Sequence, residues 1–444
     1  IYKLSLYSYQ YHPIILKSFD FIPIFANRFI YYQTEIMRYK LSAPLQPKAV
    51  IELPASKSIS NRALIIHALG RGTTVPANLS DCDDTRVMIQ ALTENHDVID
   101  ILAAGTAMRF LTAYLCVTPG TRVITGTARM QQRPIQILVN ALRELGAQIE
   151  YVGNEGFPPL RITGGELNGQ EVTLKGDVSS QYISALLMIG PVLKNGLTLH
   201  LTGEIISRPY INLTLQLMTD FGAKAEWISE NCIRVAPHPY SDTAFRVESD
   251  WSAASYWYQI AALSSQSSIK LKGLFEKSYQ GDSRGAAVFA KLGVATEFTD
   301  GDVILRQTSE YPERLDEDFI DIPDLAQTFV VTCALLNIPF RFTGLQSLKI
   351  KETDRIAALI TEMAKLGYVL RHENNSVLIW NGERCEPHAT AVINTYEDHR
   401  MAMAFAPASI VFPQMRIDEP HVVSKSYPNY WNDLRLAGFG IEEE

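Results

Sequence analysis

The stretch Asp177-Val178-Ser179-Ser180 decides the fold, because this short polar cluster leads directly into an apolar segment and the chain repeats the pattern. Six such openings occur, and the intervals between successive starts are 48, 72, 73, 74 and 73 residues. Self-similarity at a nearly constant interval indicates one structural unit used several times. The other five openings are Lys57-Ser58-Ile59-Ser60, Gly105-Thr106-Ala107-Met108, Asp250-Trp251-Ser252-Ala253, Asp324-Leu325-Ala326-Gln327 and Glu397-Asp398-His399-Arg400.

Each unit contains a second, weaker pattern after its first predicted helix. An extended segment such as residues 197–202 precedes another helix that ends at a glycine, for example Gly222. Glycine just beyond a helix favours the left-handed conformation that terminates it. Alternating segments such as residues 369–372 then predict strands. The unit is therefore predicted to run strand, helix, strand, helix, strand, strand, and the first copy is about 25 residues short, as if a hairpin were missing.

Length and composition describe a globular enzyme. A chain of 444 residues exceeds what one core usually supports, so six units predict two domains of three units each. Hydrophobic residues make up 47% and charged residues 20%, which excludes a disordered or fibrous chain. The five cysteines share no metal-ligand or redox spacing, so we expect buried free thiols and a cytoplasmic protein. No apolar run approaches the length of a membrane span.

Residues 1–36 do not match the remainder of the chain. They are rich in Tyr, Ile and Phe and follow neither the period of a helix nor the alternation of a strand. A targeting peptide is one interpretation, but the expected order of charged, apolar and cleavage segments is missing. We therefore expect a non-native or disordered extension before Met37.

The formal net charge of −8 argues against a nucleic-acid-binding protein, which usually carries a basic stripe. Lysines and arginines nevertheless gather at or beside the six openings. Helix N-termini carry unpaired N–H groups and a partial positive charge that attract anions. The pattern predicts a strongly electropositive cleft for small anions, although Asp177, Asp250 and Asp324 are also typical helix N-caps. The basic residues concerned are Lys57, Arg62, Arg109, Arg129, Arg208, Lys351, Arg355, Arg400 and Lys425.

Eight short motifs follow one another between Met37 and the end of the chain. They are Leu53-Pro-Ala-Ser-Lys-Ser-Ile-Ser-Asn-Arg62, Gly105-Thr-Ala-Met-Arg109, Arg129-Met-Gln-Gln-Arg-Pro134, Val178-Ser-Ser-Gln181, Ser207-Arg-Pro-Tyr210, Ile322-Pro-Asp324, Lys351-Glu-Thr-Asp-Arg355 and Asp398-His-Arg-Met-Ala-Met403. In this order they resemble the motifs of the 5-enolpyruvylshikimate-3-phosphate synthase family. Any one motif is weak evidence, whereas eight in family order make a chance agreement negligible.

The resemblance implies an α/β fold, a two-domain inside-out α/β barrel built from six βαβαββ-like repeats, three per domain. Crossovers near Ala55 and Glu248 give domain I residues 37–55 plus 249–444 and domain II residues 56–248. The implied reaction moves the enolpyruvyl group of phosphoenolpyruvate to the 5-hydroxyl of shikimate 3-phosphate and releases phosphate. No metal or organic cofactor is implied. The expected partners are these two anionic substrates, with no nucleic acid, no membrane and a monomeric protein.

Binding roles follow from the chemistry and from the resemblance. Shikimate 3-phosphate needs donors for its phosphate and partners for its hydroxyls, whereas phosphoenolpyruvate needs cations, above all planar guanidinium groups. The alternatives are helix caps for the serines and exposed surface positions for the arginines. The residues implied for shikimate 3-phosphate are Lys57, Ser58, Arg62, Ser179, Ser180, Gln181, Ser207, Tyr210, Asp324 and Lys351. Those implied for phosphoenolpyruvate are Lys57, Gly105, Arg129, Gln181, Arg355, Arg400 and Lys425.

Asp324, Glu352 and Lys57 are the implied catalytic residues. Asp324 takes the proton of the 5-hydroxyl, and Glu352 delivers a proton to the methylene carbon of phosphoenolpyruvate. The surrounding cations should lower the pKa of both carboxyl groups, which opposes these roles. We therefore expect both groups to reach working pKa values only in the closed complex with the two substrates.

Other motif residues are expected to support these groups. His399 should orient its neighbours through hydrogen bonds rather than act as an acid or base. Asp354 should pair locally near a helix start, and Lys351 and Arg355, one turn apart, should share a face. The alternative for this segment is a merely charged first helical turn.

Three positions depart from the family pattern. Ala103 and Ser347 stand where relatives often have Asn, and Phe110 replaces the usual Pro. These changes, with the shortened first unit, leave substrate affinity and sensitivity to glyphosate open. Two rival functions remain: the sister transferase that adds enolpyruvate to UDP-N-acetylglucosamine, and a non-catalytic anion-binding module. The first should show Lys-Asn at the first opening and a reactive loop cysteine, but Ser58 follows Lys57; the second is disfavoured because both carboxylates are present.

Overall fold

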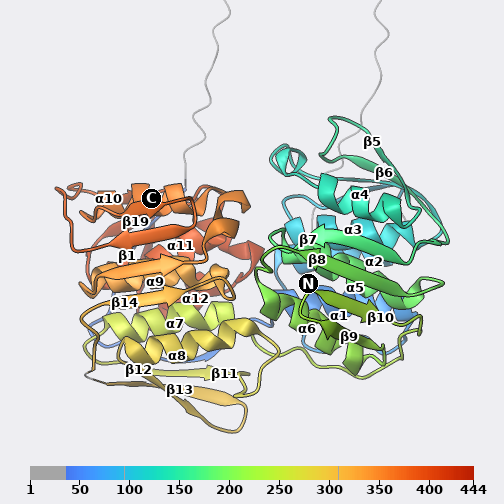
Figure 1. Cartoon of the computed structure of the whole chain (residues 1–444). Coiled ribbons are helices and arrows are strands. Elements are labelled where there is room, and N and C mark those ends of the chain that lie inside the picture. Colours follow the sequence, from blue (N-terminus) through green and yellow to red (C-terminus); the bar gives the residue numbers. More distant parts are fainter. Residues whose placement is uncertain (1–36, 95, 309) are drawn as a thin grey trace, which may run out of the picture. The chain divides into compact units, whose positions relative to one another are not determined.

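The computed structural model describes residues 37–444 except residues 95 and 309, so the expectation for residues 1–36 lies outside the described residues. Numbered by their openings, units two to six each form a four-stranded sheet (Figure 1). In every sheet the first strand is parallel to the second, and the fourth strand lies antiparallel between the second and the third. The predicted order of strands and helices within a unit is confirmed.

Units two and three are continuous in the sequence. Unit two consists of β3 (Val98–Asp100), α3 (Gly105–Cys116), β4 (Gly120–Thr125), α4 (Gln136–Glu144), β5 (Gln148–Tyr151) and β6 (Leu160–Gly164). Unit three consists of β7 (Glu171–Lys175), α5 (Ser180–Ile189), β8 (Leu197–Thr202), α6 (Arg208–Asp220), β9 (Ala225–Ser229) and β10 (Cys232–Val235).

Units four and six each borrow a strand from the beginning of the described chain. Strand β2 pairs in parallel with β11 as the first strand of unit four, and β1 lies between β19 and β20 as the fourth strand of unit six. Unit four consists of β2 (Lys48–Glu52), α7 (Trp251–Leu263), β11 (Ser268–Lys272), α8 (Gly285–Lys291), β12 (Val294–Phe298) and β13 (Asp302–Gln307). Unit six consists of β18 (Val392–Ile393), α11 (His399–Phe405), β19 (Met415–Asp418), α12 (Tyr430–Leu436), β20 (Gly440–Glu443) and β1 (Arg38–Ser42).

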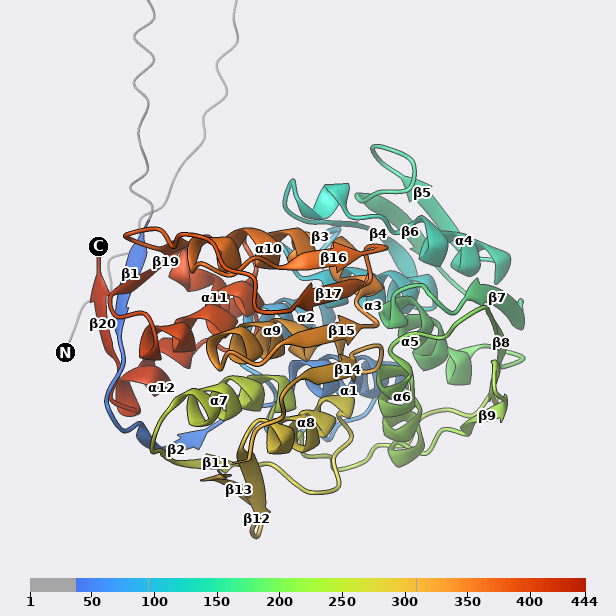
Figure 2. The same ribbon diagram turned by 60° about the vertical axis from the view of Figure 1, so that its left-hand side comes forward.

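Unit five is again continuous, and Figure 2 looks onto its sheet. It consists of β14 (Leu315–Asp318), α9 (Ala326–Leu335), β15 (Phe340–Thr343), α10 (Arg355–Lys365), β16 (Arg371–Glu373) and β17 (Val377–Trp380). Unit one keeps the helices α1 (Lys57–Gly70) and α2 (Asp83–Thr93) but forms no four-stranded sheet among the described residues. A single parallel bridge between Ala77 and Arg246 is found instead. The lack of a complete sheet agrees with the expectation that the first unit is missing a hairpin.

The first helix of each unit lies at the centre of the packing and the sheet lies outside it. Every residue of α9 is buried, and so is every residue of α3 except Tyr114. A helix that is apolar all round is stable only when it is surrounded by protein. The strand β7, in contrast, alternates exposed and buried residues, as expected for a sheet with one solvated face. Helices inside and sheets outside give the inside-out arrangement.

Two separate hydrophobic cores form in this way. Core I contains buried residues from 41–53 and 251–439, and core II contains buried residues from 55–247. The chain passes between them twice at one place, where Ala55 and Ser249 form an antiparallel bridge. Backbone hydrogen bonds from Ser56 N to Glu248 O (2.9 Å) and from Asp250 N to Pro54 O (2.9 Å) hold the two passages together.

Four of the five cysteines are buried free thiols, as expected, but Cys385 is exposed. Its thiol donates to the Ala364 carbonyl oxygen at the end of α10. None of the helices that the structure describes is long and apolar enough to cross a membrane.

Candidate active site

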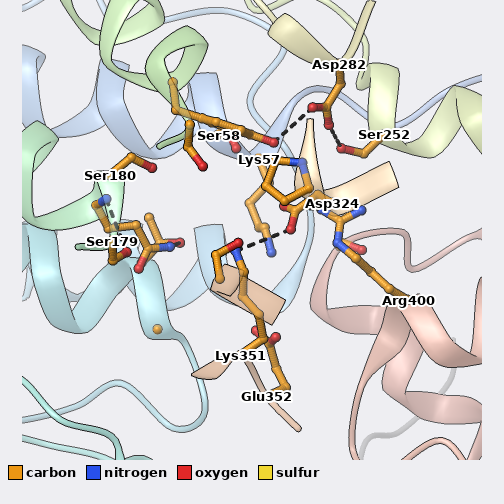
Figure 3. A pocket seen from close by; sticks show the side chains of 18 of the residues that line it. Lys57, Ser58, Ser179, Ser180, Ser252, Asp282, Asp324, Lys351, Glu352 and Arg400 are labelled. Atoms are coloured by element: carbon orange, nitrogen blue, oxygen red, sulfur yellow. Dashed lines mark hydrogen bonds and ion pairs between the residues drawn. The ribbon is translucent and has the colours of Figure 1, made fainter. Parts of the chain in front are cut away.

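One pocket collects residues from the openings of all six units. It lies between elements of core I and core II, so residues far apart in the sequence face each other across it (Figure 3). Unpaired N–H groups at helix starts attract anions. The residues from the openings that line it are Lys57 and Ser58, Gly105 and Thr106, Asp177 with Ser179 and Ser180, Asp250 with Ser252 and Ala253, Asp324, and His399 with Arg400.

Short polar side chains fix where these helices begin. Asp250 caps α7 by accepting from Ser252 N (2.7 Å) and Ala253 N (3.1 Å), and Ser179 caps α5 by accepting from Gln181 N (3.4 Å). Helix capping therefore does account for these two residues, yet both also line the pocket. Asp324 makes no capping hydrogen bond and is used differently.

Asp324 faces three cations. Its carboxylate lies 2.8 Å from Arg400 Nη2, 3.2 Å from Arg355 Nη1 and 3.4 Å from Lys351 Nζ. Burial opposes ionisation, but the attraction of Arg400, Lys351 and Arg355 outweighs it and holds the pKa of Asp324 well below its usual range. In the absence of substrate this group is a carboxylate with low basicity.

Glu352 is bound to the same guanidinium as Asp324. Its Oε2 accepts from Arg355 Nη2 at 2.9 Å, so Arg355 joins the two carboxylates. Burial again opposes ionisation, and the positive charges of Arg355 and Arg133 outweigh it, so the pKa of Glu352 is well below its ordinary value. The expected lowering of both pKa values is confirmed.

Asp398 positions the two arginines and was given no role from the sequence. It is fully buried, accepts from Arg355 Nε at 2.7 Å, and caps α11 by accepting from Arg400 N at 2.9 Å. A charge-assisted contact of this kind orients a guanidinium firmly. Asp354 has the local role expected of it, capping α10 through Ala357 N (3.1 Å).

Lys351 and Arg355 do not share a helical face, because α10 begins only at Arg355. The segment before the helix is irregular and places Lys351 in the pocket, where both cations contact Asp324 Oδ1. The charged first turn expected as an alternative is therefore also wrong.

Arg62 is held by the protein itself. It donates to Thr214 Oγ1 (2.7 Å), Ser58 O (2.9 Å) and Ser184 Oγ (3.0 Å), and its guanidinium lies 5.1 Å from the centre of the Phe110 ring. Burial lowers the pKa of Arg62 to about 10, which still leaves it charged near neutral pH. Phe110, a departure from the family pattern, thus makes a cation–π contact with Arg62.

The predicted binding residues line the pocket with two exceptions. Arg129 is exposed and does not line it, although its Nη2 lies 3.4 Å from the Glu352 carbonyl oxygen. Lys425 directs its ammonium to the Glu397 carbonyl oxygen (2.7 Å), and its own carbonyl lies 3.5 Å from Lys57 Nζ. The predicted residues that line the pocket are Lys57, Ser58, Arg62, Gly105, Ser179, Ser180, Gln181, Ser207, Tyr210, Asp324, Lys351, Glu352, Arg355 and Arg400.

The pocket is less electropositive than the sequence predicts. Arg109 lines it as one of the basic residues named for the cleft, Arg133 lines it without having been named, and acidic residues line it as well. Among the described residues that line it, seven Lys or Arg face six Asp or Glu. One of the six, Asp84, lies 3.5 Å from Lys57 Nζ. Further lining residues that the sequence reasoning missed are Tyr182, Tyr256, Ser252 and Asp282.

The expectation that His399 orients its neighbours through hydrogen bonds is wrong. Neither ring nitrogen has a hydrogen-bond partner among the described residues, and Nδ1 lies 3.9 Å from Asp398 Oδ1. Burial and then the charges of Lys57 and Arg400 hold the pKa of His399 well below its usual value. A neutral imidazole, whose two ring nitrogens make no hydrogen bond to the described residues, therefore lines the pocket.

Helix starts from two cores, paired guanidinium groups and two adjacent carboxylates define an α/β enzyme whose substrates are small anions. A family model described as EPSP synthase (3-phosphoshikimate 1-carboxyvinyltransferase) matches residues 42–94 and 91–434. The chain belongs to this family.

Curated relatives of the chain carry the name 3-phosphoshikimate 1-carboxyvinyltransferase. One, from Bacteroides fragilis, is 75% identical over 406 residues, which cover 91% of this chain and 99% of the relative. Another, from Shewanella halifaxensis, is 38% identical and covers 86% of this chain and 95% of its own length. A solved EPSP synthase from Acinetobacter baumannii is similar in fold, with a TM-score of 0.71 at 20% identity over 92% of this chain and 100% of that one. The two-domain inside-out α/β fold class is thereby confirmed.

Proposed function

We propose that the protein transfers the enolpyruvyl group of phosphoenolpyruvate to the 5-hydroxyl of shikimate 3-phosphate and releases phosphate. The observation that carries this proposal is the pair of carboxylates, Asp324 and Glu352, bound to the one guanidinium of Arg355 inside a pocket of cations and helix starts. Membership of the EPSP synthase family supports the same reaction.

The first step is an addition. The 5-oxygen of shikimate 3-phosphate forms a bond to C2 of phosphoenolpyruvate while Asp324 takes the hydroxyl proton. Glu352 gives a proton to C3, and the methylene becomes a methyl group. General acid and base groups held at the reacting atoms each contribute roughly 10²–10⁴ in rate.

The second step is an elimination. The bond between C2 and the phosphate oxygen breaks, C3 returns its proton to Glu352, and the double bond forms again. The proton taken from the hydroxyl leaves with the phosphate. Lys57, whose ammonium lies in the pocket beside Asp84, neutralises the leaving phosphate and gives it a proton, and Asp324 returns the hydroxyl proton to Lys57. Atoms and charges balance with no further reactant.

The substrates divide the pocket according to their charges. Ser179 and Ser180 donate to the phosphate of shikimate 3-phosphate from the start of α5, with Ser207 and Lys57 beside them. The other proposed contacts of this substrate are Ser58, Arg62, Gln181, Tyr210, Asp324 and Lys351. Phosphoenolpyruvate is assigned Lys57, Gly105, Gln181, Arg355 and Arg400, joined by Arg129 and Lys425 when their side chains turn inward.

Substrate binding supplies the pKa values that catalysis needs. Two multiply charged anions compete with Asp324 and Glu352 for Arg355 and Arg400, so the carboxylates lose part of the attraction that lowers their pKa values. Glu352 can then hold a proton and Asp324 can accept one. Residues 37–55 plus 249–444 act as domain I and residues 56–248 as domain II. The two domains close on the substrates and exclude water from the pocket. The protein works as a monomer in the cytoplasm.

Phosphate release tests the proposal. Mixing the protein with both substrates should release phosphate continuously, and either substrate alone should release none. Release with UDP-N-acetylglucosamine in place of shikimate 3-phosphate would point to the sister transferase. Binding of both anions without phosphate release would leave only an anion-binding module.

A further inference from the structure

A hydrogen bond between two side chains joins the two cores beside the catalytic groups. Tyr210, in α6 of core II, donates its hydroxyl to Asp282 Oδ1 at 3.0 Å, and Asp282 belongs to a short 3₁₀ turn, η3 (Gly281–Arg284), next to α8 of core I. Both residues line the pocket. Nearby, Ser207 N donates to the Ile320 carbonyl oxygen at 3.0 Å, again from one core to the other.

Asp282 also contacts the start of α7. Its Oδ2 accepts a short hydrogen bond from Ser252 Oγ, and the two side chains lie across the pocket from Ser179 and Ser180 (Figure 3). Asp282 therefore ties Tyr210 to a helix start that faces the substrates.

Gly281 allows the two segments to approach. A Cβ atom built on Gly281 would lie 2.4 Å from Pro209 Cβ, closer than any real contact of this kind. Pro209 precedes Tyr210 in the first turn of α6. Any larger residue at 281 requires either Pro209 or the turn around Gly281 to shift, and either shift disturbs the approach of Tyr210 to Asp282.

The environment of Asp282 is costly for a carboxylate. Its exposed fraction is 4%, and in the described part of the chain its hydrogen-bond partners are two hydroxyl groups rather than a cation. The positive charge of Arg400 opposes this cost only in part, and a buried carboxylate whose hydrogen-bond partners are neutral remains unfavourable. Burial and the negative charge of Asp324 raise the pKa of Asp282 to about 6. A carboxylate that only stabilised the start of η3 through the helix dipole would stabilise it equally well from an exposed position, so that role does not explain the burial of Asp282.

We propose that Asp282 is a positioning residue for shikimate 3-phosphate, which holds the Tyr210 hydroxyl against the pocket, and that Gly281 makes this contact possible. The inference rests on the proposed function, because Tyr210 is assigned there to this substrate. The single Tyr210 proton points to Asp282, so its oxygen presents lone pairs to a substrate hydroxyl.

Steady-state kinetics of three variants test the role of Asp282. D282A should raise the KM for shikimate 3-phosphate about tenfold, the effect of losing one hydrogen bond to a charged group, with a smaller change in kcat and in the KM for phosphoenolpyruvate. D282N keeps an acceptor oxygen and should stay within about threefold of the wild type. Y210F should match D282A, and the double variant should be no worse than Y210F alone. Additive effects, or equal rises in both KM values, overturn the proposal.

A steric test is independent of the charge. G281A should raise the KM for shikimate 3-phosphate as D282A does, and P209G added to G281A should restore it because the colliding Cβ and Cγ atoms are removed. P209G alone is the control. If D282A does not fold, G281A and its rescue decide, and a normal KM in G281A overturns the proposal.

Hydrogen exchange separates this inference from the proposed function. No phosphate release by the wild-type protein with both substrates would refute the function. Exchange at residues 207–210 would still report the contact, because Ser207 N is bonded across the cores. Faster exchange there in G281A supports the contact, and unchanged exchange overturns it.

Discussion

Replacing Glu352 by Gln removes the proposed acid and almost nothing else. The amide keeps an oxygen for Arg355 Nη2, which now lies 2.9 Å from Glu352 Oε2. Arg355 also keeps Asp398 at 2.7 Å and Asp324 at 3.2 Å, so the folded state should lose about 1 kcal/mol or less. Turnover should fall by roughly 10²–10⁴, the usual contribution of a general acid.

Three measurements examine E352Q together. Phosphate release at saturating substrate gives kcat, calorimetry gives the affinity for shikimate 3-phosphate, and a thermal melt gives stability. The affinity should stay within about threefold, because a contribution made only in the transition state leaves ground-state binding unchanged. The limb of the kcat–pH profile that reports Glu352 should also disappear.

Asp354 provides a matched control two residues away. It caps α10 through Ala357 N and does not line the pocket, and D354N keeps a good capping side chain. D354N should therefore turn over like the wild type. Turnover of E352Q within threefold of the wild type would falsify the assignment of Glu352, and a similar loss in D354N would show that the segment, not the acid, is responsible.

Three further predictions use other parts of the structure. F110L removes the ring beneath Arg62 and should weaken shikimate 3-phosphate binding about threefold, with phosphoenolpyruvate unaffected; equal losses in calorimetry would contradict it. The pKa of Asp282 is raised from 3.8 to about 6, so this group stabilises the folded state fully below pH 3.8 and loses that contribution as the pH rises through 6. The Tm of D282N minus the Tm of the wild type should therefore increase from pH 4 to pH 7. A constant or falling difference would refute the assignment of this pKa. One thiol, Cys385, should react rapidly with a thiol reagent in the native protein and none in C385S, while a second fast thiol would contradict the described burial.

The repeat and the helix starts were predictable because their causes are local. Ser179, Asp250 and Asp398 cap helices through hydrogen bonds to residues two or three positions away, so polar residues before apolar segments mark them. The glycine after the second helix of units two to six is equally local, as at Gly222 with φ 84°. A pattern of this kind needs no knowledge of the fold.

The pairing of β1 and β2 with distant strands was not predictable from the residues. Lys48–Glu52 pairs with Ser268–Lys272, and the registers of both strands are set by the closing of the sheets rather than by any nearby turn. The same holds for Asp282, whose partners Ser252 and Tyr210 come from different cores. In sequence it is an ordinary acid near a helix start.

The near balance of charge in the pocket follows from what the enzyme must do without substrate. Arginines that were free to bind phosphate and carboxylate groups would repel one another, and Asp324 and Glu352 neutralise them through their ion pairs. Under the proposed function, each substrate anion that takes a guanidinium group releases a carboxylate. In this proposal, substrate binding and the rise of the catalytic pKa values have the same cause, because the substrate anions replace the carboxylates as partners of the guanidinium groups. A substrate analogue that lacks its anionic group should therefore bind weakly and also fail to activate Glu352. Full proton transfer with such an analogue bound would show that the pKa values are set by some other cause.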